Sequence, residues 1–113
     1  MKSRIFRPEF LNDERLFDCG DHALIVYLGL MSMADREGRL EDRPVRIKAV
    51  VLPYHDVDID SLLTNLHNQN FITRYEENGL NCIEIKDFES LQKPHPKENK
   101  SNLPCNSMKC REI

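Results

Sequence analysis

The sequence predicts a small α+β domain, on three observations. Near its start, apolar residues at helical spacing are followed by a short segment of strand character. Two more helical patterns then follow each other over residues 44–69, and the second is amphipathic. After them, residues 71–75 and 81–86 have strand character and flank Asn78-Gly79, which suits the primed turn of a hairpin. This order is the plan of a winged helix-turn-helix, with about three helices and a small antiparallel β-hairpin as the wing.

The length of 113 residues fits one domain with tails. We expect an N-terminal arm over residues 1–20, the winged-helix domain over residues 21–88, and a basic, mostly disordered tail over residues 89–113. No apolar run approaches the roughly 20 residues that span a bilayer, and no signal peptide is visible at the N-terminus. We therefore expect a cytoplasmic protein that has no membrane partner.

The first helix is expected over residues 22–35, with Asp21 as a candidate N-cap. Its apolar residues cover most of its sides, which is typical of a helix at the centre of a core. Gly29 would let another helix approach closely, and Gly38 suits the left-handed position that ends a helix. Residues 39–41 are expected to form a short strand that pairs with the later hairpin.

The second and third helices have recognisable start and stop signals. Pro44 suits the first position of a helix, and Pro53 stops that helix. Asp58 is the expected cap of the third helix, which runs to about Gln69. In a helix-turn-helix this third helix would be the one that enters the major groove of DNA.

The strongest candidate for function is the polar face of that third helix. Asn pairs with adenine through two hydrogen bonds, and Ser or Thr can bond to bases or phosphates. The face consists of Ser61, Thr64, Asn65 and Asn68. The alternative is a solvated helix face without function.

Cations elsewhere could hold phosphates. Arg43, Arg46 and Lys48 form the main candidate stripe, together with Arg36 and Arg39; the alternative is surface pairing with Glu37, Glu41 and Asp42. Arg74 and Lys86 would flank the contact from the wing. In the tail, Lys93 and Lys97 are electrostatic partners for DNA, unless they serve only solubility.

Charge is unevenly spread, which complicates a nucleic-acid interpretation. The net charge is +2 over residues 1–10, −7 over residues 11–85 and +2 over residues 86–113. Asp56, Asp58 and Asp60 surround the start of the third helix and would repel phosphates there. The basic residues must therefore cluster locally, or the two ends of the chain must supply them.

The sequence gives little support for a metal, a cofactor or catalysis. Cys105 and Cys110 are separated by four residues, but structural zinc sites usually have two close pairs, and no second pair exists. We expect ordinary thiols at all four cysteines in a cytoplasmic protein. No nucleophile elbow, phosphate-binding loop or dinucleotide fingerprint occurs, so we expect a protein that is not an enzyme.

Several segments carry a resemblance to a known family. They are Arg7-Pro8-Glu9-Phe10, Leu28-Gly29-Leu30, the run from Ala34 to Pro44, Leu52-Pro53-Tyr54, Asp58-Ile59-Asp60 and the run from Gln92 to Glu98. Through them, residues 4–104 resemble the N-terminal domain of phage and prophage replication-initiation proteins of the replisome-organiser kind. The resemblance implies a winged helix that binds double-stranded DNA during phage replication in a bacterial host cell.

The resemblance also implies a second region that engages host or phage replication proteins, and we expect that region to be absent here or encoded elsewhere. An acidic, free-standing domain suggests an alternative function. The chain would then be a protein-binding module or a phage-encoded inhibitor, whose acidic face mimics nucleic acid. The position of the cations relative to Asn65 discriminates between these hypotheses. The sequence does not fix the oligomeric state.

Overall fold

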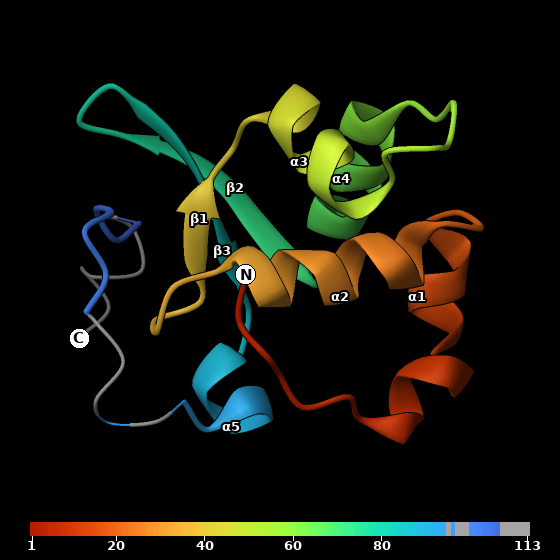
Figure 1. The fold of residues 1–113 in the computed structure, drawn as a ribbon, viewed down its shortest axis with the longest axis horizontal. Helices are drawn as coiled ribbons and strands as arrows, with labels where there is room; N and C mark the ends of the chain where they lie inside the picture. The colour runs from red at the N-terminus through yellow and green to blue at the C-terminus, as the bar shows by residue number, and fades with distance from the viewer. Residues whose placement is uncertain (95, 97–99, 107–113) are drawn as a thin grey trace.

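The computed structural model describes residues 1–94, 96 and 100–106. It is an α+β domain with five α-helices and a three-stranded antiparallel sheet within this described part of the chain, and the sheet lies to one side of α2, α3 and α4 (Figure 1). The elements in order are a 3₁₀ helix η1 (Pro8–Asn12), α1 (Glu14–Asp18), α2 (Ala23–Met33), β1 (Arg39–Glu41), α3 (Pro44–Val51), α4 (Ile59–Asn68), β2 (Ile72–Glu77), β3 (Leu80–Ile85) and α5 (Phe88–Gln92).

The sheet has the order β1-β3-β2, so the short first strand pairs with the return strand of the hairpin. Leu40 lies opposite Ile83, and Arg74 lies opposite Ile83 from the other side. The β2–β3 turn contains Asn78 and Gly79 at positive φ angles of 55° and 77°, as a primed turn requires. The predicted hairpin and the predicted pairing of residues 39–41 are both confirmed.

The helix α2 lies at the centre of the molecule, with α3 and α4 packed on one side of it (Figure 1). Gly29 allows the close approach of α3, because a Cβ atom there would lie 2.1 Å from a methyl carbon of Val51. Buried side chains of the helices and sheet form one core, whose largest members include Leu30, Met31, Leu63, Leu66, Ile72, Ile83 and Ile85. The expected central position of the first helix is therefore observed.

The N-terminal segment is more ordered than the predicted arm. It contains η1 and α1, and it contributes Phe10 and Leu16 to the core. Asp13 caps α1, since its carboxylate accepts hydrogen bonds from the backbone N–H groups of Arg15 and Leu16. The two short helices of the arm are thus part of the folded domain, to which Phe10 is docked while Leu11 is exposed.

Gly38 has a different role from the predicted one. The helix α2 already ends at Met33, and Ala34 after it is extended. Gly38 has a φ of +79° in the turn that leads into β1, where a Cβ would lie 2.5 Å from the Cβ of Phe88. The prediction of a helix cap at Gly38 was wrong because the chain leaves the helix one turn earlier.

The C-terminal segment adds a helix, α5, that the sequence pattern did not predict. The buried Gln92 of α5 exchanges two hydrogen bonds with the backbone of Ile5, at 2.5 and 2.9 Å. Further along, the hydroxyl of Tyr75 donates to the carbonyl of Pro104 at 2.8 Å, and the backbone N–H of Ser101 donates to Glu37. Residues 101–104 are therefore bound to the domain, in contrast to the expected disorder. No helix in the described part of the chain has the length and apolar character that crossing a membrane requires.

Candidate nucleic-acid interface

The predicted polar face of α4 is exposed. The four residues of this face are all exposed to solvent: Ser61, Thr64, Asn65 and Asn68. The helix turns its other side inward, where Leu62, Leu63 and Leu66 are buried. The amphipathic pattern in the sequence therefore identified the correct exposed face.

One of these polar side chains, that of Ser61, already has a partner at the start of α4. The Asp58 carboxylate accepts from the backbone N–H of Ser61 at 3.2 Å and from its hydroxyl at 3.0 Å. The Ser61 backbone N–H, followed by the Ser61 hydroxyl, holds the pKa of Asp58 below its ordinary value. Asp58 is thus the predicted N-cap, and it remains charged at the end of the helix where a phosphate would otherwise be favoured.

Asn65 holds the α1–α2 connection. Its side-chain amide donates to the backbone carbonyl of Cys19 at 3.0 Å. An Asn that reads adenine needs both its donor and its acceptor, and here the donor is bound to the protein. Asn68, one turn further on, has no hydrogen bond to a described residue, so its amide is available to a ligand.

Arg74 is bound by two carboxylates and does not flank an open contact. Its guanidinium contacts Asp42 at 2.6 and 2.9 Å and Asp60 at 2.8 Å, and it donates to the Thr64 hydroxyl at 3.1 Å. These contacts, those of Asp42 first, raise the pKa of Arg74 despite its partial burial. The network joins α4 to the corner between β1 and α3, and it leaves Arg74 little capacity for a phosphate.

The cations of α3 differ in exposure. Arg46 is exposed and makes no ion pair with a described residue, whereas Arg43 has a long contact of 3.8 Å with Glu41. Lys48 is half-buried and donates to the Leu52 carbonyl at 3.5 Å, where it serves the end of α3. Of the predicted stripe, Arg43 and Arg46 are therefore the accessible members.

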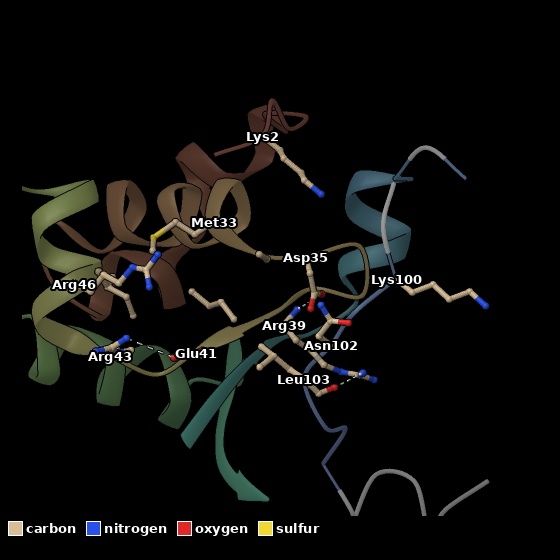
Figure 2. Close-up of a pocket in the computed structure, with 13 residues that line it drawn as sticks. Lys2, Met33, Asp35, Arg39, Glu41, Arg43, Arg46, Lys100, Asn102 and Leu103 are labelled. Atoms are coloured by element: carbon tan, nitrogen blue, oxygen red, sulfur yellow. Dashed lines mark hydrogen bonds and ion pairs between the residues drawn. The ribbon is translucent and has the colours of Figure 1, made fainter. Parts of the chain in front are cut away.

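Arg43 and Arg46 line a hollow between α3, β1 and the end of α2 (Figure 2). It has a volume of about 390 Å³ and an apolar floor that includes Met33, Leu40 and Ile47. The basic side chains around it come from four separate parts of the chain and are Lys2, Arg39, Arg43, Arg46 and Lys100, against the carboxylates of Asp35 and Glu41. An excess of cations around a concave surface favours an anionic ligand.

The hollow shows what the sequence analysis missed. Lys2 and Asn102 line it, although neither was predicted as a site residue. Arg39 also lines it, but its side chain is largely buried, 3.6 Å from Glu84, and it donates to the Leu103 carbonyl. The positive charge of both chain ends was the available signal, because it indicated that the ends supply cations to the acidic body.

Of the two predicted tail residues, Lys93 is among the residues that the structure describes. Lys93 is exposed at the end of α5, where its backbone has a positive φ of 46°. Lys97 lies outside the described residues, and so does Cys110. Lys93 is not among the residues around the hollow.

The cysteines and acidic groups form no metal site of three or more ligands within the described residues. Cys19 and Cys82 are buried free thiols, and burial raises the pKa of both. Cys105 takes part in a disulfide, which differs from the expectation of a free thiol at that position.

Comparison of the chain with protein families, with curated proteins and with solved structures finds no match.

Proposed function

We propose that the chain is a DNA-binding domain of the winged-helix class. The order α2-β1-α3-α4-β2-β3 supports this class, because it is the helix, strand, helix, helix and hairpin plan that the sequence predicts. The turn of the hairpin extends away from the helices, as a wing does (Figure 1). In this arrangement α4 is the recognition helix and α3 lies against the DNA backbone.

The observation that carries the proposal is the exposed pair Arg43 and Arg46 beside the cation-lined hollow. Phosphate contacts provide most of the non-specific affinity for DNA, and exposed Arg side chains are suited to them. Arg74 supports the same interpretation indirectly, since it neutralises Asp42 and Asp60 between α4 and the start of α3. It thereby lowers the repulsion that a phosphate would meet there.

Sequence readout in this proposal rests mainly on Asn68, with a smaller part for Ser61, Thr64 and Asn65. These three side chains already bind Asp58, Arg74 and Cys19, respectively, within the protein. We further propose that the domain acts in replication initiation of a phage or prophage, in the cytoplasm of the bacterial host. The resemblance of residues 4–104 supports this role.

The test is fluorescence anisotropy with a labelled mixed-sequence duplex at several salt concentrations. We expect binding that weakens steeply as salt rises, because phosphate contacts release counterions. Arg43→Glu should weaken binding at least tenfold. Arg15→Glu is the matched control, since it makes the identical charge change at an exposed arginine of α1 that does not line the hollow. Equal loss in both variants would show a general charge effect and no defined interface.

A second candidate function has its own observation. Tyr54 is 95 % exposed and is followed by the exposed Asp56 and Asp58. Exposed Tyr side chains are enriched among residues that dominate protein–protein binding. The chain would then be a protein-binding module or an inhibitor with an acidic face that mimics nucleic acid. An absence of duplex binding at low salt, where attraction is strongest, would favour this function.

A further inference from the structure

A second exposed surface lies around α1, at the end of the molecule away from the sheet (Figure 1). Phe17 is 73 % exposed there, and Leu11 is 55 % exposed. Between them is a small hollow of about 120 Å³, whose apolar walls are Phe10, Leu11, Leu16, Phe17 and Leu24. We call this surface the α1 hollow.

The apolar residues of the α1 hollow are contiguous, which distinguishes them from single exposed side chains. Phe10 and Leu16 form its buried base, and they belong to the core. Phe17 and Leu11 form its open rim. Scattered apolar side chains on a surface are ordinary, but an apolar patch around a concavity is typical of an interaction site.

Acidic side chains lie at the same hollow and on the helix beside it. Asp21 lines it, while Glu14 and Asp18 lie beside Phe17 on the short helix α1. All three are exposed and form no ion pair with a described residue. Asp13 differs, because its carboxylate caps α1 and lies 3.8 Å from Arg15. The surface at the α1 hollow and on α1 therefore carries negative charge from Asp21, Glu14 and Asp18.

We propose that the α1 hollow binds a cationic amphipathic segment of a partner protein. One aliphatic side chain of that segment fills the hollow, whose volume approaches that of a cavity of about 150 Å³ that holds a benzene ring. Lysine or arginine residues on either side of it contact Glu14, Asp18 and Asp21. Charge complementarity favours this occupant, and it disfavours nucleic acid, whose phosphates the same carboxylates repel.

This inference goes beyond DNA binding and does not depend on it. The α1 hollow and the Arg43–Arg46 surface share no residue. A partner protein and a duplex could thus occupy the domain at the same time. A variant that loses one kind of binding should retain the other.

The experiment uses the full chain and a fluorescein-labelled synthetic peptide of about 15 residues, with Leu on one helical face and Lys on the other. A second peptide with Ser in place of Leu is the control for simple charge attraction. We expect the Leu peptide to bind at least fivefold more tightly than the Ser peptide. Phe17→Ala should remove that advantage, and Val45→Ala, which shortens an apolar side chain that is 85 % exposed on α3, should not.

The negative charge at the α1 hollow is tested with a pair of double variants. Asp18→Asn with Asp21→Asn should weaken binding of the Leu peptide about fivefold. Glu76→Gln with Glu89→Gln makes the same change in net charge at distant exposed positions and should have little effect. Circular dichroism and urea unfolding of each variant show that it is folded.

Several outcomes would overturn the proposal. Equal binding of both peptides, no binding at millimolar peptide, or equal loss in Phe17→Ala and Val45→Ala would each reject the α1 hollow as the site. A dimer in sedimentation that Phe17→Ala dissociates would assign the surface to a second copy of the chain. The affinity of Phe17→Ala for duplex DNA should equal that of the parent chain. This measurement therefore separates the test of the α1 hollow from the test of the proposed DNA function.

Discussion

Arg74 and Arg46 are two predicted phosphate contacts with opposite surroundings. The side chain of Arg74 is 20 % exposed and contacts two carboxylates within 3 Å, whereas Arg46 is exposed at the edge of a cation-lined hollow. Both are arginines on elements of the expected interface. The difference teaches that the carboxylates within reach, rather than the residue type, decide whether an arginine serves the fold or a ligand.

The largest effect is expected for Arg74→Ala. Asp42 has only 9 % of its side chain exposed, so the variant would leave a nearly buried carboxylate without its cation. We expect the free energy of unfolding to fall by about 3 kcal/mol. Urea unfolding of the parent and the variant measures this difference in the free energy of unfolding.

Arg74→Ala combined with Asp42→Asn is the control, because the double variant removes the stranded charge. It should recover part of the lost stability. A loss below about 0.5 kcal/mol for Arg74→Ala alone would show that the network contributes little, and Arg74 would again be a candidate ligand-binding residue.

The next effect separates two asparagines on the same face of α4. Asn65→Ala removes the hydrogen bond to the Cys19 carbonyl and should cost about 1 kcal/mol. Asn68→Ala removes no hydrogen bond to a described residue and should leave unfolding nearly unchanged. In duplex binding the order reverses, since Asn68→Ala should reduce sequence preference more. Equal stability of the two variants would contradict this assignment.

The Asp58 cap predicts a pH dependence. Its pKa is lowered in the folded protein, so its contribution to stability is present above the ordinary carboxyl value of 3.8 and is lost as pH falls through the folded value. Asp58→Ala should therefore be less stable than the parent near neutral pH, and the difference should shrink at lower pH. Asp56→Ala is the exposed neighbouring control. Urea midpoints from pH 7 to pH 2 measure both, and a constant difference would reject the cap.

The smallest effect on stability is expected for Arg46→Ala. Its exposed side chain has no ion pair with a described residue, so the free energy of unfolding should change by less than about 0.5 kcal/mol. Its effect should instead be on binding. Affinity should fall alike for all duplex sequences, and the salt slope should decrease by about one. A sequence-dependent loss would indicate a base contact.

Local signals in the sequence were sufficient for the central elements. Pro44 at the start of α3, Asp58 at the start of α4 and Asn78-Gly79 in the hairpin each act through neighbours within a few residues. Their physical effects therefore do not depend on the rest of the fold. The exposed face of α4 followed from apolar spacing for the same reason.

The partners of the charged and amide side chains could not be predicted in this way. Arg74 meets Asp42 from 32 residues away, and Gln92 meets Ile5 from 87 residues away. Such pairs depend on the packing of whole elements, which no spacing rule contains. The cation-lined hollow has the same origin, since both chain ends and α3 must converge to form it.

The pairing of Gln92 with Ile5 has a consequence for how the chain exchanges its amide hydrogens. Backbone N–H groups near a terminus are normally among those that exchange fastest with solvent, because terminal residues fray. Here the N–H of Ile5 donates to a buried side chain of α5. It should exchange only when the N-terminal segment and α5 separate, so the amide of the fifth residue reports on a contact with a helix near the other end.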